Sequence, residues 1–500
     1  MATSETTVTS VDKIPDEEKK VTGVKPQYFG RKVITLDAEE VTGENVTSLL
    51  NTALATHTYN RLQIQYLWDY YKGRQPIMGK EKDYREDINN KIVVNRAFEI
   101  VSFFSGFLYS APIAYAARKG AEGVSNAIEA INDMMSAENK ERKDFELITW
   151  LLVAGTSYRY LMSKEATDEF DNAPFEIETL DPRDTFVAYS NRPGHKQLLS
   201  CTYWNDDNGD PTYGVYTDKI YYEIKGGNII SSAPHYHGRN PIVEFPANFA
   251  RLGIFEPVLP LIDAGNQIES DRLDGLEQYI KGFVKFINCE LEEGDLEEFF
   301  RQGAIMVSGH EGKGTPDVGF VNTEVSQTDT QTQADSIYNM ILTICGMPNR
   351  NGGSSTSDTG SAVIFRDGWE SASSRALSIE NMFKGAEIET LKLCLRILKE
   401  KNFSGYDEQT VKDIKALRLR DIDVHFGRRN YANAMSKVQV LCQMLAEPKI
   451  HPRYAFEISD LFTDPENAYM QSMENYDKLL ESYDPTKVSE EDLAKEDDDV

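Results

Sequence analysis

The stretch GMPNRNGGSSTSDTGS, residues 346–361, decides how this chain is interpreted. It is rich in Gly, Ser, Thr, Asn and Asp and has no apolar periodicity, which predicts an exposed, flexible loop. The stretch lies between two strong helical patterns and not between two domains. A long polar loop inserted between helices therefore needs a functional explanation.

The helix before this loop is predicted over residues 330–345. Its apolar side chains recur at i, i+3, i+4, i+7, i+8 and i+11, beginning at Ala334 and ending at Cys345. Asp329 or Thr330 is the predicted N-cap, and Gly346 followed by Pro348 is a strong stop signal.

The helix after the loop is predicted over residues 362–403, from a pattern that runs from about 361 to 401 without a proline. A helix of this size would be roughly 60 Å long at 1.5 Å per residue. Such length exceeds the usual range of globular proteins and is typical of a coiled coil or a large assembly.

The rest of the chain divides into segments that differ in composition and in the spacing of their apolar residues. Residues 1–43 are polar and predict a mobile arm, and residues 484–500 hold eight acidic and two basic residues and predict a disordered, solvated tail. The other predicted elements are a helix at 44–72, an apolar and aromatic segment at 92–109, two helices at 120–165 of which the second can run on into a strand, an antiparallel meander at 174–246, a helix at 255–282, a small α/β insert at 283–325, a strand at 422–426, and helices at 431–446, 452–462 and 465–482.

Composition excludes several classes of protein. The chain has 500 residues, 40% of them hydrophobic, and a formal net charge of -28, so it would repel nucleic acid on average. Five scattered cysteines without a CxxC pair suit a reducing compartment. The polar N-terminus lacks a signal-peptide pattern, and no apolar stretch reaches the ~20 residues of a membrane span. We expect a soluble protein that is intracellular while it is made.

The sequence offers no convincing active site. Three residues separate Gly309 from Lys313, and Gly314 stands where a phosphate-binding loop needs Ser or Thr. His235 and His237 could form a metal pair, but no third ligand is suggested and an ordinary hairpin is the better interpretation. No GxSxG, HExxH or paired Cys-His arrangement occurs. We therefore predict that the chain is not an enzyme and needs no cofactor or metal.

Ten short stretches, taken in order and spacing, resemble a known family. They are YLWDYYKG (66–73), DINNKIVVN (87–95), GFLY (106–109), API (111–113), NPIVEF (240–245), FEPV (255–258), LIDA (261–264), ESD (269–271), MPN (347–349) and SDTGSA (357–362). Together with the order of elements, they resemble the portal proteins of siphophages that infect Gram-positive bacteria, the group typified by a Bacillus phage portal. The resemblance spans roughly residues 55 to 480.

The resemblance implies an α+β, mainly helical portal fold that assembles into a ring of twelve subunits in the virion. It implies these regions: a flexible arm (1–43), a wing (44–250), a first stem helix (251–282), a clip (283–329), a second stem helix (330–345), a tunnel loop (346–361), a long wing or spine helix (362–403), a crown (404–482) and an acidic tail (483–500).

The resemblance also implies partners and a location. Double-stranded DNA passes through the central channel during packaging and ejection. The terminase docks on the clip, and head-completion or adaptor proteins replace it afterwards. The portal nucleates assembly with scaffolding and major capsid proteins in the host cytoplasm and remains at the capsid vertex, with no membrane involved.

Candidate site residues follow from these regions. The DNA contacts expected in the tunnel loop are Asn349, Arg350, Asn351, Gly352, Gly353, Ser354, Ser355, Thr356 and Ser357. Lys281 and Lys285 are candidates for lining the channel, or alternatively for pairing with the acidic 290–298 run at a subunit interface. The candidates for partner docking on the clip are Glu292, Glu293, Asp295, Glu297 and Glu298.

The excess of acidic residues in the chain suits a channel through which DNA moves. Each Lys or Arg that pairs with a phosphate adds affinity and hence friction, so an acidic channel lets DNA slide. Small uncharged side chains in the loop can form weak, replaceable hydrogen bonds to phosphates. Gly265, Gly275 and Gly282 depart from an ideal stem helix and would mark close helix contact or a bend.

Two other functions remain as alternatives. One is a capsid-associated adaptor or scaffold protein without a DNA channel, which would not need the 346–361 loop before a long helix. The other is a metal-dependent hydrolase, which the absence of a nucleophile, metal or phosphate motif in the sequence disfavours.

Overall fold

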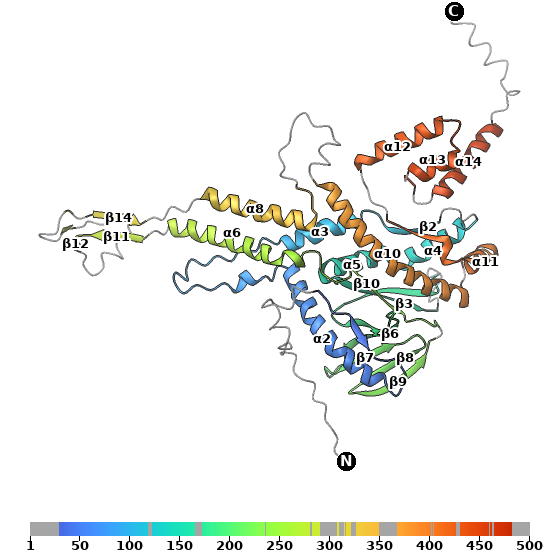
Figure 1. The fold of residues 1–500 in the computed structure, drawn as a ribbon, viewed down its shortest axis with the longest axis horizontal. Coiled ribbons are helices and arrows are strands. Elements are labelled where there is room, and N and C mark those ends of the chain that lie inside the picture. Colours follow the sequence, from blue (N-terminus) through green and yellow to red (C-terminus); the bar gives the residue numbers. More distant parts are fainter. Residues whose placement is uncertain are drawn as a thin grey trace, which may run out of the picture. The chain divides into compact units, whose positions relative to one another are not determined.

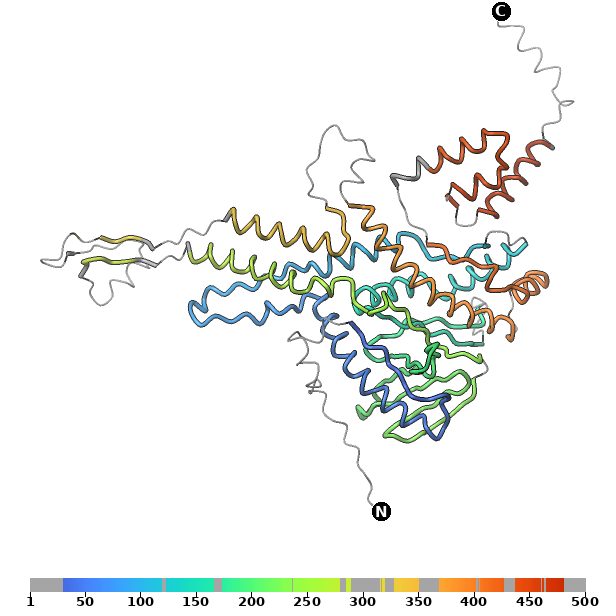
Figure 2. Tube along the Cα trace, viewed as in Figure 1, coloured from blue at the N-terminus to red at the C-terminus, as the bar shows by residue number. Residues whose placement is uncertain are grey.

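The computed structural model describes residues 30–118, 123–165, 173–235, 237–280, 283–290, 308–309, 315, 317–321, 327–349, 368–401, 403, 405–426, 431–459, 461–462 and 465–482. The chain divides into two compact units. Unit 1 contains residues up to 68, 99–257 and 346 onward, and unit 2 contains residues 69–98 and 258–345. Figures 1 and 2 trace the elements of both units.

A six-stranded sheet forms one core of unit 1. Its order is β1-β5-β6-β7-β8-β9, with bounds Ile34–Leu36, Thr185–Ser190, Gln197–Asn205, Pro211–Tyr216, Ile220–Lys225 and Asn228–Pro234. Helix α2 (Val46–Tyr71) covers this sheet, and its Val46, Leu50 and Ala53 pack against buried side chains such as Phe186 and Leu199. Buried apolar side chains from β1, β5, β6, β7 and β8 create the face that α2 buries, whereas every residue of β9 is exposed.

The predicted meander is confirmed for β5 to β9, which are consecutive antiparallel neighbours. Gly226 and Gly227 have φ of 56° and 79° and form the two-residue turn between β8 and β9. Such a turn needs positive φ at both positions, which glycine adopts without strain.

A three-stranded sheet contains the remaining strands of the predicted meander. Its order is β10-β3-β4, with bounds Ile242–Pro246, Thr156–Ser163 and Phe175–Leu180. Helix α5 (Lys140–Ala154) packs against β3 and β4, and helix α10 (Trp369–Glu400) packs against β10 and β3. The prediction that the second helix of 120–165 runs into a strand is confirmed by α5 followed by β3.

The predicted mobile arm is wrong for its last residues. Ile34 and Leu36 are buried, and β1 pairs in parallel with β5. Arg31 is also buried, where its guanidinium donates to Glu256 Oε1 at 2.5 Å and to Gln63 Oε1 at 2.9 Å. Residues 1–29 lie outside the described residues, as does the predicted acidic tail at 483–500.

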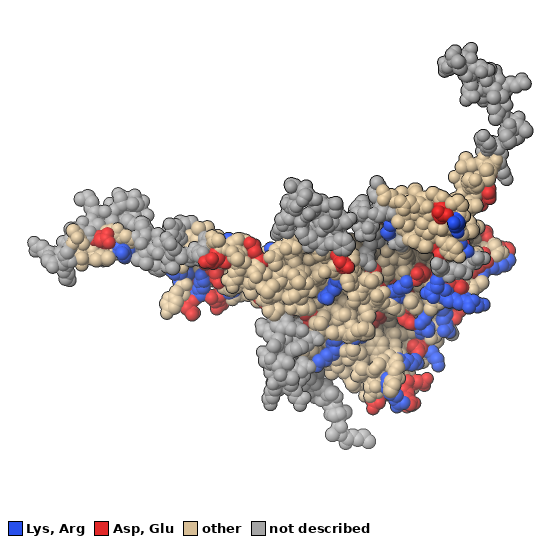
Figure 3. Space-filling model, turned by 45° about the horizontal axis from the view of Figure 1, so that its top comes forward, with Lys and Arg blue, Asp and Glu red and all other residues tan. Residues whose placement is uncertain are grey.

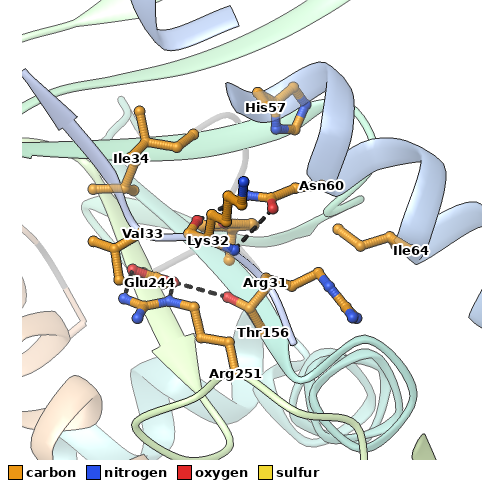
Figure 4. Close-up of a pocket in the computed structure, with 12 residues that line it drawn as sticks. Arg31, Lys32, Val33, Ile34, His57, Asn60, Ile64, Thr156, Glu244 and Arg251 are labelled. Carbon is orange, nitrogen blue, oxygen red and sulfur yellow. Dashed lines mark hydrogen bonds and ion pairs between the residues drawn. The ribbon is translucent and has the colours of Figure 1, made fainter. Parts of the chain in front are cut away.

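A small polar cavity lies behind this N-terminal strand (Figure 4). Its volume of about 10 Å³ is close to the room that one water molecule needs. Asn60 Nδ2 donates to the Lys32 carbonyl, and Arg251 and Thr156 both donate to Glu244 Oε1, at 2.6 and 3.0 Å. Burial lowers the pKa of the neighbouring His57 to about 4, so its imidazole is neutral. This lining fastens residues 31–34 to the sheet by polar contacts.

A two-stranded sheet joins segments that we predicted to lie in different regions. β15 (Ile422–Phe426) pairs antiparallel with β2 (Ile113–Ala117), and α11 (Glu408–Ala416) packs on α4 (Ser125–Ala137). The predicted boundary between the spine helix and the crown, at residue 404, therefore assigns the paired strands β2 and β15 to different regions. Residues 405–426 belong with the elements of the predicted wing, because backbone pairing with β2 satisfies the hydrogen bonds of β15.

Three further helices follow in unit 1. They are α12 (Tyr431–Ala446), α13 (Pro452–Ser459) and α14 (Pro465–Ser482), and α13 packs against both of the others. These helices match the three helical stretches that the sequence predicts for the crown.

Unit 2 is built on two helices that lie side by side, α6 (Leu259–Ile280) and α8 (Gln327–Cys345). A 3-10 turn (Glu256–Val258) precedes α6, and another (Pro76–Gly79) lies in the 69–98 segment. β11 (Phe283–Ile287) pairs antiparallel with β14 (Asp317–Val321), and β12 (Cys289–Glu290) pairs with β13 (Ser308–Gly309). The predicted strands of the insert are confirmed where the structure describes them.

Two details of the predicted helices of unit 2 are revised. α8 begins at Gln327, so Asp329 lies in its first turn and the predicted cap at Asp329 or Thr330 is wrong. α6 is continuous through Gly265 and Gly275, and a Cβ at Gly265 would lie 3.9 Å from Ile337 Cγ2 of α8. Gly265 therefore marks a close contact between the two helices.

Candidate functional site: the loop connecting α8 and α10

Residues 346–349, at the start of the predicted tunnel loop, lie next to Gly368 in unit 1. Residue 361, the predicted end of the loop, lies outside the described residues. Gly346 follows α8 with φ of 72°, and Gly368 precedes α10 with φ of 83°. A Cβ at Gly368 would lie 3.9 Å from the Met347 carbonyl oxygen and from Pro348 Cα. The chain thus leaves this point after residue 349 and has returned to it by residue 368.

The left-handed conformation of Gly368 also fixes where α10 begins. A residue with positive φ cannot continue a right-handed helix, so α10 starts at Trp369. The predicted helix start at 361 or 362 is therefore wrong. The 32 residues of α10 correspond to about 48 Å at 1.5 Å per residue, shorter than the roughly 60 Å expected from the sequence.

Aromatic side chains hold the start of α10. The Trp369 ring lies 6.1 Å from the Phe103 ring and 6.1 Å from the Phe107 ring, both on α3 (Arg96–Leu108). The two phenylalanine rings stack on each other at 5.7 Å. On the other side of the loop, Met347 and Pro348 are buried. Both ends of the loop are thus anchored in apolar packing.

A buried charge network holds the middle of α10. Glu387 is fully buried, where it accepts a hydrogen bond from the Tyr115 hydroxyl at 2.7 Å and lies 3.1 Å from Arg159 and 3.0 Å from Lys140. Asp144 completes the network by pairing with both Arg159 and Lys140. Burial alone would raise the pKa of Glu387, but Lys140 and Arg159 outweigh it and keep the pKa below its usual value. The network connects α10 to α5, β2 and β3.

A polar ladder fastens the 90–95 segment to α6 in unit 2. We use this name for Asn266, Ser270 and Asp274, which are all buried on one face of α6. Their side-chain oxygens accept from the backbone N–H groups of residues 94, 92 and 90, at 2.8, 2.9 and 2.7 Å. Four residues of helix advance about 6 Å and two residues of extended chain about 6.6 Å, so the two spacings match.

Asp274 is the charged end of this ladder. It also accepts from Lys80 Nζ at 2.7 Å and from Lys82 Nζ at 2.5 Å. Burial alone would raise the pKa of Asp274, but the hydrogen bonds from Lys80, Lys82 and Asn90 outweigh it and hold the pKa well below its usual range. The ladder keeps α6 attached to the segment 80–95 along much of its length.

Helices α6 and α8, the predicted stem helices, are both acidic. Helix α6 contains five carboxylates and one arginine, and α8 contains two carboxylates and no Lys or Arg. One face of α8 borders an open groove of about 560 Å³ lined by Thr332, Asp335, Ser336, Asn339, Met340, Thr343 and Ile344. This face mixes hydroxyl and amide side chains with the exposed apolar side chains of Met340 and Ile344. In Figure 3, Lys and Arg side chains lie among Asp and Glu side chains and form no broad basic patch among the described residues in view.

The structure describes two of the predicted nucleic-acid contacts. Asn349 is half-buried at the first end of the loop, and Lys285 is exposed on β11, opposite Gly319 of β14. The remaining candidates lie outside the described residues: Lys281 of the stem, Arg350 to Ser357 of the loop, and Glu292, Glu293, Asp295, Glu297 and Glu298 of the clip. The candidate phosphate loop at 309–315 falls largely outside them as well.

The histidine pair has other partners in the structure. His235 Nε2 lies 2.8 Å from the Thr217 carbonyl oxygen, and His237 Nε2 lies 3.3 Å from Ser163 Oγ. The two rings stack with centroids 5.6 Å apart. Within the described residues, no group of three or more His, Cys, Asp and Glu side chains is placed to hold a metal ion. No helix in the described part of the chain is both long enough and apolar enough to cross a membrane.

Comparison with known proteins identifies the family. Residues 50–485 match the family of phage portal proteins described as SPP1 Gp6-like. The chain is a member of the phage portal protein family. This match covers both stem helices, the loop between α8 and α10, and nearly all of the described residues. It confirms the predicted assignment to the phage portal proteins and the predicted α+β portal fold.

Solved structures include similar chains. Of this chain, 73% aligns with 90% of a chain in the neck of a native GTA particle computed with C12 symmetry, at 11% identity and a TM-score of 0.44. A chain in the neck of an empty GTA particle computed with C6 symmetry aligns over the same shares, at 12% identity and a TM-score of 0.39. No curated protein sequence matches this portal protein.

The sequence analysis does not predict the contacts that hold α6 and α10 in place. The polar ladder has a detectable signal, because Asn266, Ser270 and Asp274 recur every four residues on α6. Glu387 also has one, because it replaces an apolar residue in the stripe of Phe383 and Leu391. The aromatic contact of Trp369 has no signal in the local sequence, because its partners lie more than 250 residues away.

Proposed function

We propose that this portal protein forms a ring, with twelve copies in the virion, at one vertex of the capsid of a tailed bacteriophage. The channel of the ring conducts double-stranded DNA during packaging and ejection. The protein acts as a structural conduit and not as an enzyme, in keeping with the structural role of its family. The twelvefold number and the siphophage type follow from the family resemblance.

The adjacent positions of residues 347–348 and Gly368, on either side of the segment that contains the predicted loop, carry this proposal. An insertion whose two ends are fixed at one point can project from a rigid base without disturbing the helices that carry it. Trp369 and the buried Glu387 fix α10 behind the loop. We therefore assign the loop as the constriction and α6 with α8 as the conduit wall.

The charge of the two stem helices supports sliding contact. A wall in which seven carboxylates outnumber one arginine forms few ion pairs with phosphate, and cyclic symmetry repeats that property around the channel. On α8, the described face next to the groove carries Thr, Ser and Asn side chains, a single carboxylate, and the exposed apolar side chains of Met340 and Ile344, none of which forms an ion pair with phosphate. Its hydroxyl and amide groups exchange hydrogen bonds with phosphates and water at little cost.

The remaining regions complete the proposed assembly. The clip at 283–329 would receive the terminase during packaging and head-completion or adaptor proteins afterwards. Scaffolding and major capsid proteins would join the ring in the host cytoplasm, before it becomes part of the virion. Lys281 and Lys285 would contact DNA or the acidic 290–298 run of a neighbouring subunit.

Deletion of residues 350–359 tests the proposed role of the loop. The deletion leaves both anchored ends in place, so rings should assemble in normal yield while DNA packaging or retention falls. A matched control shortens the β8–β9 turn by removing Gly226, which lies on unit 1 away from the loop. Normal packaging by the 350–359 deletion would show that the loop is not the DNA contact.

A further inference from the structure

An apolar pocket with a cationic rim lies on unit 1, between α10 and the segment 418–424. Its volume is about 310 Å³. The floor consists of the branched side chains Ile388, Leu391, Leu419, Ile422 and Val424. Arg118, Lys384, Arg420 and Asp423 complete the lining. The pocket therefore offers branched apolar contacts surrounded by three cations and one carboxylate.

The cations of the rim are only partly neutralised. Lys384 Nζ lies 2.5 Å from Asp423 Oδ1, and the Arg420 side chain is 72% exposed with a contact of 3.5 Å to Asp421. Arg118 donates its backbone N–H to the Asp421 carbonyl at 2.8 Å, and its side chain is in no ion pair with the described carboxylates. A local excess of positive charge stands out in a chain whose net charge is -28.

This combination selects an acidic peptide that carries a branched apolar residue. The apolar floor would bury one Leu or Val side chain, which contributes about 1.5–3 kcal/mol when it is fully buried. The guanidinium groups would pair with neighbouring carboxylates, and arginine forms such pairs with two parallel hydrogen bonds. Nucleic acid lacks the branched apolar group that the floor would bury.

The chain itself contains a segment of this chemistry. Residues 490–493 read Glu-Glu-Asp-Leu, and they lie in the acidic stretch 484–500, beyond the described end of α14 at Ser482. Three carboxylates precede Leu493, which matches three cations around one apolar floor. We propose that the 490–493 segment of this chain, from the same copy or a neighbouring one, docks in this pocket.

A photo-crosslinking experiment on the full-length protein tests the proposal. A benzophenone amino acid replaces Leu493, and crosslinked peptides are identified by mass spectrometry. We expect crosslinks to peptides containing residues 384–391 and 419–424. Crosslinks within one copy and between copies both support the proposal. Crosslinks confined to other parts of the chain, or none, would overturn it.

Charge variants separate specific docking from chance proximity. R118E/R420E should reduce the crosslink yield about tenfold, because two attractive contacts become repulsive. The matched control K412E removes a 70% exposed cation from α11 outside the pocket and should leave the yield unchanged. Neutralising the segment with E490Q/E491Q/D492N should lower the yield without altering any described residue. Equal yields in all four proteins would contradict the assignment.

Discussion

Replacement of Asp274 by Asn tests the polar ladder of α6. The substitution keeps the size of the side chain and one acceptor oxygen, but it removes the charge that Lys80 and Lys82 contact at 2.7 and 2.5 Å. A hydrogen bond to a charged group contributes about 1.5–3 kcal/mol. Loss of two such bonds should therefore destabilise the attachment of residues 80–95 by about 3 kcal/mol.

Amide hydrogen exchange measures this attachment directly. The N–H groups of Asn90, Ile92 and Val94 donate to α6 side chains, so their exchange reports opening of the ladder. A loss of about 3 kcal/mol corresponds to exchange about 150-fold faster, since 1.4 kcal/mol is tenfold.

The control is D271N, which changes the same residue type on the same helix. Asp271 also contacts Lys80, at 2.8 Å, but its side chain is 53% exposed. An exposed ion pair contributes at most about 1 kcal/mol, so exchange should change less than about fivefold. If D274N and D271N accelerate exchange equally, burial of Asp274 does not carry the energy that we assign to it.

Three further predictions concern the anchoring of α10 and the response to acid. E387Q leaves the two buried cations Arg159 and Lys140 with Asp144 as their one shared carboxylate and should lower the free energy of unfolding by about 3 kcal/mol in urea, whereas E389Q, 45% exposed on the same helix, should change it by less than about 1 kcal/mol. W369A removes the ring that packs on Phe103 and Phe107 and should speed amide exchange at residues 370–373 at least tenfold, while L377A, 52% exposed on α10, should not. The folded state holds the pKa of Asp274 below its unfolded value near 4, so its stabilisation is present above about pH 4 and is lost as the pH falls toward the folded pKa; acid unfolding of D274N should be less steep than that of the parent protein.

The elements with a regular period could be predicted from the sequence. α8 and the strands β5 to β8 follow directly from the pattern of their apolar residues, as does the stop at Gly346. The family resemblance added the order of regions, and the match over residues 50–485 confirms the family. Local periodicity and local stop signals are the information that a single sequence carries most clearly.

The errors arose where long-range contacts decide the structure. Residues 30–36 look like part of a polar arm, but Arg31 is buried because Glu256, 225 residues away, pairs with it. β15 looks like the start of a crown, but its partner β2 lies about 300 residues earlier. The start of α10 was placed too early because Gly368 takes a left-handed conformation that a helical pattern does not reveal.

The charged residues of the core could not be identified from composition. With 27% charged residues, a carboxylate on a helix is usually exposed to solvent. Glu387 and Asp274 are exceptions because cations from other segments compensate their burial. Their spacing on the buried faces of α10 and α6 was the available signal, and it becomes informative only when the partner segments are known.

The mass of the purified full-length protein tests the central claim most directly. Twelve copies of a 56.6 kDa chain give a closed ring of about 0.7 MDa. Native mass spectrometry should detect this assembly, and electron microscopy should show rings with a central channel. A stable monomer or dimer at high protein concentration, without rings in the images, would contradict the assignment of this chain as a ring-forming DNA conduit.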